Sequence, residues 1–163
     1  MAEEHCNAAD PHENHLWLTQ FVGEWTFVSE SRMGPDQPVI NLPGSESVRS
    51  FGGFWILGEG QGEMPDGTKG NMLLTLGYDV ARACFTGSWI GTMMTNLWVY
   101  QGSLDPERRV LTLDTEGPGM DGGTSKYQDI HEIVNEDHRV LRSRMLGEDG
   151  KWIQFNESNY HRK

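Results

Sequence analysis

The chain has 163 residues, of which 36% are hydrophobic, and it carries a formal net charge of −11 at pH 7. This length suits one domain with a substantial core and is too short for two. The negative charge repels phosphates, so nucleic acids and anionic membrane surfaces are excluded as partners.

The compartment is predicted from what the sequence lacks. No apolar run approaches the length of a bilayer span, and the N-terminus has neither the basic nor the apolar region of a signal peptide. The two cysteines, Cys6 and Cys84, stand far apart, and reduced thiols are the simpler account of them. We therefore expect a cytoplasmic protein that does not contact a membrane.

The first predicted element is a short helix. Residues 1–9 form a polar leader, and residues 10–163 form a single domain. Asp10 is the expected N-cap, with Pro11 at the first helical position and Glu13 completing a capping box. A buried stripe of Leu16, Trp17 and Phe21 would then lie across one mouth of the fold.

The stretch 16–33 continues from this helix into a strand. Gly23 allows a close crossing of the chain, and Trp25 opens an alternating segment in which Trp25 and Phe27 share one side. A large aromatic residue placed just after a glycine suits the closed end of a small antiparallel barrel, where its indole ring fills the floor.

The rest of the chain is predicted to be almost entirely strand. A loop containing three prolines covers residues 34–44, and the chain becomes extended again from Glu46. In residues 54–64 every second position from Gly58 to Gly62 is glycine, which predicts that something bulky packs over that face. Further strands are expected at 72–78, 82–90, 97–104, 110–116, 125–134, 139–146 and 152–160. About nine or ten strands joined by hairpins predict an all-β fold, an antiparallel up-and-down barrel.

Three blocks of sequence are similar to a known family. They are FVGEWTF, the long segment from LGYDV to DTEGP, and the terminal EDGKWIQFNESNYHRK. In these blocks, from about Leu16 onward, the chain resembles the bacterial family catalogued as domain of unknown function 1579. The resemblance implies a lipocalin-like, or calycin-like, barrel and implies no chemistry. The Gly-x-Trp motif also resembles that of true lipocalins, in which a basic residue from a late strand covers the tryptophan. Arg142 or Arg144 would take that part over Trp25 by a cation–π contact.

A barrel of this size is either filled by side chains or wide enough for one small ligand. Aromatic walls with a few polar groups are typical of small-molecule pockets. The residues predicted to line such a pocket are Trp55, Tyr78, Trp89, Trp98, Tyr100 and Tyr127. The alternative for each of these rings is that it belongs to the core.

Four residues are weak catalytic candidates. Asp129 and His131 share one strand face with Tyr127, so the carboxylate could orient and charge the imidazole as a general base requires. Glu59 and Glu63 share another face and could act as acid and base. The alternatives are a surface ion pair for the first two residues and solvent-facing side chains for the second two.

No metal or cofactor is predicted. The histidines and the cysteine of the N-terminal region could bind zinc or nickel adventitiously, but a polar leader explains them more simply (His5, Cys6, His12 and His15). A haem barrel would need an internal axial histidine, for which His131, His138 and His161 are the late candidates, and no haem motif is present. Phosphate-binding glycine patterns are absent as well.

Three functions remain open. The leading hypothesis is a binding protein that holds a small hydrophobic or aromatic molecule inside the barrel. The second is a barrel enzyme, such as an isomerase, cyclase or hydrolase, that uses one of the carboxylates or the histidine. The third is a homodimeric interaction module that uses Met93, Met94 and Trp98 as an apolar patch.

Overall fold

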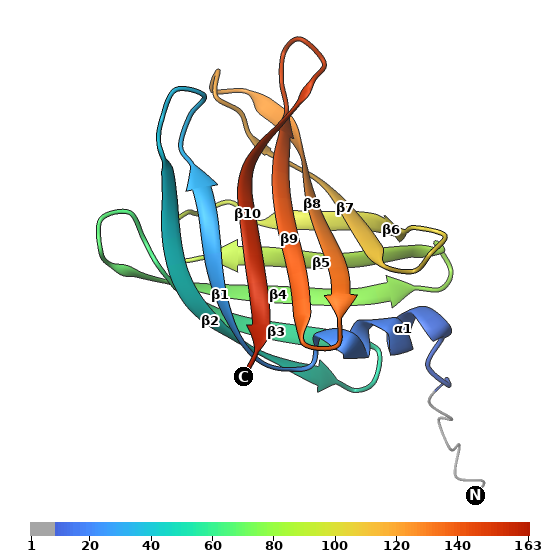
Figure 1. Cartoon of the computed structure of the whole chain (residues 1–163). Helices are drawn as coiled ribbons and strands as arrows, with labels where there is room; N and C mark the ends of the chain where they lie inside the picture. The colour runs from blue at the N-terminus through green and yellow to red at the C-terminus, as the bar shows by residue number, and fades with distance from the viewer. Residues whose placement is uncertain (1–8) are drawn as a thin grey trace, which may run out of the picture.

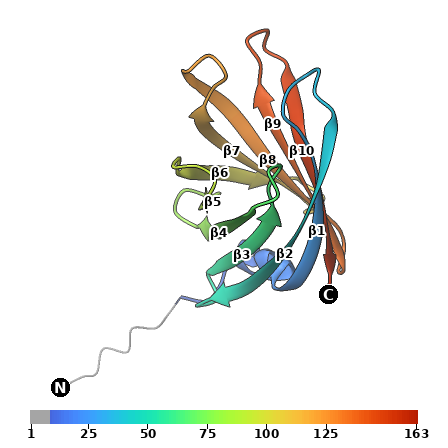
Figure 2. The same cartoon turned by 90° about the vertical axis from the view of Figure 1, so that its left-hand side faces the viewer.

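The computed structural model describes residues 9–163 as a closed barrel of ten antiparallel strands (Figures 1 and 2). The helical elements are α1 (Glu13–Leu18) and the 3₁₀ turn η1 (Thr19–Phe21). The strands are β1 (Gly23–Arg32), β2 (Val39–Phe51), β3 (Trp55–Glu63), β4 (Lys69–Asp79), β5 (Cys84–Gly91), β6 (Trp98–Leu104), β7 (Val110–Pro118), β8 (Thr124–Asn135), β9 (His138–Leu146) and β10 (Trp152–Arg162). Each strand pairs with its neighbours in sequence, and β1 pairs with β10, so the predicted up-and-down barrel is confirmed.

The barrel has one covered end and one open end. The turns that follow the even-numbered strands lie at the end covered by α1 and η1, which we call the closed end (Figure 1). The turns that follow the odd-numbered strands lie at the opposite end, which no helix covers (Figures 1 and 2). The helix α1 therefore lies at the same end of the barrel as Trp25, as predicted.

The start of α1 differs from the prediction. The N-cap is His12 and not Asp10, and the capping box is formed by His12 and His15. The His12 ring accepts a hydrogen bond from the Asn14 N–H at 3.1 Å, while the His12 N–H donates to His15 Nδ1 at 2.8 Å. The predicted buried stripe is correct for Trp17 and Phe21. Leu16 is exposed, because the helix turns its neighbour Leu18 onto the barrel instead.

Closure of the barrel depends on the pairing of its first and last strands. The register runs from Trp25 opposite Arg162 to Ser31 opposite Asn156. At the closed end of this seam, the Trp25 indole N–H donates to the Phe21 carbonyl at 2.8 Å, and the ring is only 1% exposed. Trp25 therefore forms part of the floor, as predicted.

β2 begins seven residues earlier than expected, at Val39 in place of Glu46. The expected loop contained Pro43, which has no N–H for a sheet hydrogen bond. Pro43 lies opposite Val28 of β1, whereas the pairing of β2 with β3 begins only at Gly44. Proline is tolerated there because that side of β2 has no strand partner.

The glycine face of β3 points into the barrel, and large side chains cover it as predicted. A Cβ atom at Gly62 would lie 3.4 Å from the Phe27 ring, and one at Gly58 would lie 2.7 Å from the Glu46 carboxylate. The absence of side chains on β3 thus makes room for Glu46 of the neighbouring strand β2 and for Phe27 of β1, the next strand along.

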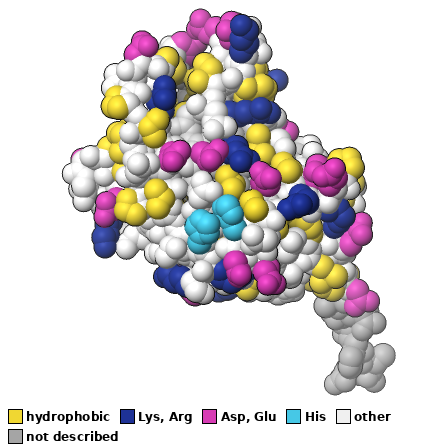
Figure 3. Space-filling model, in the orientation of Figure 1, with side chains coloured by type: hydrophobic (Ala, Val, Ile, Leu, Met, Phe, Trp, Pro, Cys, Tyr) yellow, Lys and Arg dark blue, Asp and Glu magenta, His cyan; other side chains and the backbone are white. Residues whose placement is uncertain are grey.

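The outer surface carries intermixed acidic and basic side chains on the face of β1, β2 and β8–β10 (Figure 3). Within residues 9–163, no helix combines the length and the apolar character that a membrane crossing requires. The predicted leader falls almost wholly on residues 1–8, which lie outside the described part of the chain.

Candidate ligand-binding cup

The two halves of the barrel interior differ in exposure. Most inward-facing residues near the closed end are buried, including Val48, Ile56, Leu76, Phe85, Leu111 and Ile133. Inward-facing residues near the open end keep part of their surface exposed: Ser29, Ser31, Leu42, Met72, Trp89, Trp98, Tyr127, Asp129, Met145 and Asn156. We call the space bordered by this second set the cup. Its walls are solvent-accessible although every member lies on the inner face of a strand.

An aromatic rim lines the cup near the open end. Trp89 of β5 and Trp98 of β6 are direct cross-strand partners. The Trp98 ring packs edge-to-face on Tyr127 of β8, with centroids 4.9 Å apart, and Tyr127 in turn approaches Phe155 of β10 at 6.1 Å. These four rings come from four different strands and form a broad apolar surface.

Trp98 also closes a gap in the wall. β6 and β7 are paired from Gln101 to Leu104 on the β6 side, so the backbone pairing stops before Trp98. The indole ring lies across Gly117 of β7, where a Cβ atom would be 2.3 Å from the ring, and its N–H is directed at Met94 Sδ at 3.1 Å. A side chain therefore replaces missing strand pairing at this point.

Below the rim lies a belt of hydrogen-bonded polar groups. Asp129 of β8 accepts hydrogen bonds from the Tyr100 hydroxyl and, at 2.6 Å, from Ser143 Oγ on the neighbouring strand. On the adjoining strands β10 and β1 the Ser29 and Ser158 hydroxyls are 2.6 Å apart, and Ser31 donates to Asn156 at 2.8 Å. The cup therefore has an apolar rim and a polar base.

Burial shifts the acidity of the groups in this belt. Desolvation raises the pKa of Asp129, and the hydrogen bonds from Ser143 and Tyr100 oppose that shift only in part. Desolvation, together with the neighbouring Asp129 charge, raises the pKa of Tyr100 well above its usual value. The tyrosine is thus held as a hydrogen-bond donor to the carboxyl group.

The floor beneath the belt contains a buried ion pair. The Arg139 guanidinium contacts the Glu46 carboxylate, and both side chains are almost fully enclosed. Arg139 also lies over three rings, with its central carbon 3.9 Å from the centroid of Tyr160, 4.8 Å from Trp25 and 5.0 Å from Phe21. The ion pair is therefore part of the packed floor, below the cup.

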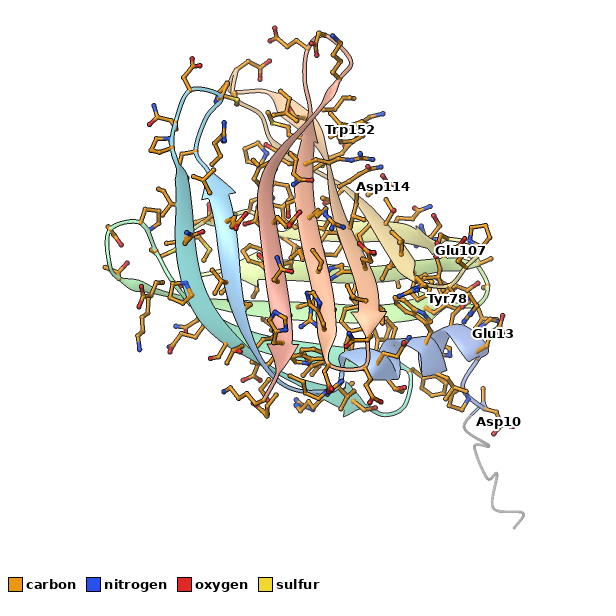
Figure 4. All side chains as sticks on the ribbon, in the orientation of Figure 1. Asp10, Glu13, Tyr78, Glu107, Asp114 and Trp152 are labelled. Carbon is orange, nitrogen blue, oxygen red and sulfur yellow. The ribbon has the colours of Figure 1, made fainter. Side chains whose placement is uncertain are left out.

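The arginines predicted to cover Trp25 were the wrong ones. Arg139 covers the indole from inside the barrel, and Arg162 covers it at 4.2 Å. Arg142 instead bridges Glu132 and Glu157 on the outer surface, at 2.7 and 2.9 Å. Arg144, also on the outer face, lies over Trp152 at 4.8 Å, and Figure 4 shows Trp152 near the open end.

Arg162 reaches Trp25 because Gly23 has no side chain. A Cβ atom at Gly23 would lie 2.2 Å from Arg162 Nη1, and the backbone there has φ +138°. The guanidinium donates to the carbonyls of Val22 at 2.7 Å and Gln20 at 3.2 Å. The predicted role of Gly23, a close approach at the base of the first strand, is thus filled by this arginine.

His131 is on the same face as Asp129, as predicted, but the two side chains form no hydrogen bond. The imidazole packs against Phe21 at 5.5 Å and is 3% exposed, with no partner for Nδ1. Desolvation, reinforced by the Arg139 charge, lowers the pKa of His131 to about 3. Asp129 therefore neither orients nor charges this histidine, and the Asp129–His131 pair of the sequence analysis is not assembled.

Four more of the predicted site residues lie away from the cup. Glu59 and Glu63 are exposed on the outer face of β3. Trp55 shares that outer face, is 40% exposed and packs on Gly77 of β4. Tyr78 is at the closed end, where its ring packs at 5.1 Å on Phe85, and Figure 4 shows it beside α1.

Four of the six predicted aromatic residues are brought together. Trp89, Trp98 and Tyr127 form most of the rim, and Tyr100 lies at the polar belt. Sequence reasoning missed Phe155, Ser143 and Asn156. Phe155 sits at an irregularity in β10 between Gln154 and Asn156, which interrupts the alternation that would have assigned its face.

The histidines His12 and His15 are used structurally. His15 Nε2 lies 2.8 Å from the Tyr78 carbonyl, and the His12 ring stacks on Tyr78 at 4.9 Å. His5 and Cys6 lie outside the described residues. Over positions 9–163, the structure places no three His, Cys, Asp or Glu side chains together in a group that could hold a metal ion.

Two hollows also occur on the surface. One, of about 280 Å³, lies at the closed end between the β6–β7 and β8–β9 turns and is lined by Arg108, Arg109 and Arg162 among others. These guanidiniums already donate to backbone carbonyls or lie near carboxylates. The other, of about 440 Å³, lies between the β3–β4 and β5–β6 turns and includes Met64 and Met93.

The closed ten-stranded meander defines a lipocalin-like β-barrel. The family model described as "Protein of unknown function (DUF1579)" matches residues 10–162, so the chain belongs to this family. No match is found among curated protein sequences.

Solved structures share the fold at low sequence identity. Rv2717c from M. tuberculosis is 15% identical with a TM-score of 0.64, and the likeness covers 94% of this chain and 99% of that one. The S-type phycobiliprotein lyase CPES from Guillardia theta is 13% identical with a TM-score of 0.57, covering 94% and 98%. The barrel EF1p2_mFAP2b bound to DFHBI is 11% identical with a TM-score of 0.50, covering 92% and 99%. At these identities the likeness establishes the fold alone.

Proposed function

We propose that this protein binds a small molecule with an apolar or aromatic body inside the cup. One observation carries the proposal: most inward side chains of the open half keep part of their surface exposed, whereas most of those of the closed half are buried. The buried exceptions in the open half are Leu74 and Thr115. The exposed set joins four aromatic rings to a few placed polar groups, which is the composition of a small-molecule site.

The fold comparisons are consistent with this proposal. One barrel of similar fold is described as bound to DFHBI, and another is a phycobiliprotein lyase. Small up-and-down barrels have an interior that can hold one small ligand. We also propose the bacterial cytoplasm as the compartment of this protein, and the free, buried thiol of Cys84 is consistent with a reducing environment.

Titration with the neutral fluorescent probe N-phenyl-1-naphthylamine tests the proposal. Trp98→Ala removes a rim ring, and Trp55→Ala removes a ring of the same type from the outer face. Because a ring contact and its buried area together contribute on the order of 1–2 kcal/mol, we expect Trp98→Ala to weaken binding about tenfold. Trp55→Ala should leave the dissociation constant unchanged.

Far-UV circular dichroism should first establish that both variants keep the wild-type strand signal. If the wild-type protein does not bind the probe, or if Trp55→Ala weakens binding as much as Trp98→Ala, the cup is not the site. Native mass spectrometry of protein purified from its own host then identifies any retained ligand.

A second candidate function, an enzyme acting by proton transfer, is favoured by the raised pKa of Asp129 beside Tyr100. The ligand recovered from the host separates the two functions. Recovery of unchanged ligand after prolonged incubation with the protein supports the binding function. Conversion into a second species that stops in Asp129→Asn supports the enzyme.

The homodimer stays a prediction. Met93 and Met94 are exposed beside the open end, at 38% and 42%, whereas Trp98 belongs to the rim. Gel filtration that gives only monomer would exclude a dimer through this patch.

A further inference from the structure

One ionisable group in the cup has no opposite charge beside it. On the inward strand faces of the described chain, the charged or imidazole-bearing residues are Glu46, Asp129, His131 and Arg139, together with Arg162 at the closed end, which lies over Trp25. Glu46 and Arg139 neutralise each other, and His131 is held neutral below them. Asp129 is therefore the single carboxyl group of the cup without a cationic partner.

The contacts of Asp129 leave room for another partner. Each oxygen accepts one hydrogen bond from a neutral hydroxyl, one from Tyr100 and one from Ser143. An ionised carboxylate has about four acceptor positions, so about two remain unused. Asp129 keeps part of its surface exposed, whereas Tyr100 and Ser143 are buried beside it. Asp129 is therefore the member of this hydrogen-bonded group that keeps exposed surface.

The surroundings of Asp129 favour a cation over other groups. Burial raises the pKa of this carboxyl group, and a positive charge would offset the desolvation that causes the shift. Above it stand four aromatic rings, and cations are attracted to the faces of such rings. The net charge of −11 also raises the local concentration of cations around the protein.

We propose that the ligand of the cup carries a protonated amine or another basic nitrogen, which pairs with Asp129 while its apolar body packs on the aromatic rim. This inference rests on the proposed binding function and names its ligand class. The amine would donate to the unused carboxylate positions and leave the hydrogen bonds from Tyr100 and Ser143 in place.

Three ligands that share one ring system test the inference: 1-naphthylmethylamine, 1-naphthalenemethanol and 1-naphthoate, each measured by calorimetric titration at neutral pH. A charge-assisted hydrogen bond in a desolvated site is stronger than a neutral one, so the amine should bind at least about tenfold more tightly than the alcohol. The carboxylate should bind most weakly. Asp129→Asn, which keeps the side-chain shape, should make the amine and the alcohol bind equally.

Asp114→Asn is the matched control. Asp114 lies on the outer face of β7, where it accepts a hydrogen bond from Gln128 at 2.7 Å, and Figure 4 labels it on that strand. The Asp114→Asn variant removes one negative charge from the protein, as Asp129→Asn does, without changing the cup. The preference for the amine should survive in this variant.

Each other outcome overturns the inference in a recognisable way. If the alcohol or the carboxylate binds as tightly as the amine, the ligand class is wrong and the binding function stands. If the preference persists in Asp129→Asn, or disappears equally in Asp114→Asn, it arises from overall acidity and not from the cup. If none of the three ligands binds, the proposed function fails together with the inference.

Discussion

Replacing Arg139 by methionine should destabilise the barrel more than any other single change in its floor. The arginine side chain is 1% exposed and holds the Glu46 carboxylate. Methionine keeps the length and apolar character of the stem, but it leaves Glu46 buried with no cation. Breaking a buried ion pair in this way typically costs about 3–5 kcal/mol, because the remaining charge is uncompensated.

Losing the aromatic contacts of Arg139 lowers the free energy of unfolding less than losing its charge does. Arg139 lies over Phe21, Trp25 and Tyr160, and a desolvated cation–π contact contributes about 2 kcal/mol. A methionine sulfur recovers about 0.3–1.5 kcal/mol against an aromatic ring. The uncompensated Glu46 charge is therefore the largest effect. Single domains have a total unfolding free energy of about 5–15 kcal/mol, so the loss is readily measured.

The double variant Glu46→Met/Arg139→Met separates charge from packing. Replacing a whole buried ion pair by apolar side chains of similar size is often neutral or stabilising, so the double variant should be more stable than Arg139→Met alone. Gly58 beneath Glu46 leaves room for the substitution. The assay is guanidinium unfolding followed by far-UV circular dichroism. A double variant that loses as much as the two single variants added together would refute the reasoning.

Three other changes have expected outcomes. Gly44→Ala places a Cβ atom 2.2 Å from the Phe27 ring and should cost about 1–3 kcal/mol in denaturant unfolding, whereas Gly60→Ala, with its nearest atom at 3.6 Å, should cost nothing. The pKa of His131 is lower in the folded state than in the unfolded state, so its contribution to stability is complete above about pH 6.5 and is lost as the pH falls towards 3. His131→Gln should therefore flatten that part of a curve of unfolding free energy against pH. The pKa of Asp129 is raised on folding, so its contribution to stability is present at low pH and is lost as the pH rises through the folded value. Compared with the wild-type protein, Asp129→Asn should therefore be more stable at pH 7 than at pH 3. An equal difference in unfolding free energy at the two pH values would contradict the assigned shift.

The fold could be predicted because its signals are local. Alternating segments separated by glycine-rich turns give the strand number, and a tryptophan just after Gly23 marks the closed end. The errors arose where a long-range contact decided the outcome. Asp10 is a good N-cap by residue type, but the helix starts two residues later, where His12 stacks on Tyr78 of a distant strand.

The identity of the arginine over Trp25 was partly readable from the sequence. In β9, alternation places Arg139 on one face with Leu141 and Met145, and Arg142 and Arg144 on the other face with Val140 and Leu146. It therefore separates the arginines without deciding which face is inward. That parity was the available signal. The second arginine, Arg162, could not be inferred, because it reaches Trp25 only through the register of β1 with β10.

The cup itself was predictable only as a kind of site. The aromatic content suggested an aromatic wall, but the inward face of β3 is the glycine face, so Trp55 points outward. For Trp55, neither the composition nor the alternation of β3 decided whether the ring points into the barrel or out of it. Assigning the faces requires knowing that the Phe27 and Glu46 side chains pack over the β3 glycines inside the barrel. That packing is a property of the closed structure.

The two halves of the interior follow opposite electrostatic rules. In the floor, where water has no access, the carboxylate of Glu46 lies against a guanidinium, because an unpaired charge there would be very costly. In the cup, Asp129 has only neutral hydrogen-bond donors, and the residue keeps part of its surface exposed. A ligand that fills the cup covers that surface and raises the cost of the unpaired carboxylate. A ligand without a compensating cation must therefore bind against this cost, whereas an amine removes it.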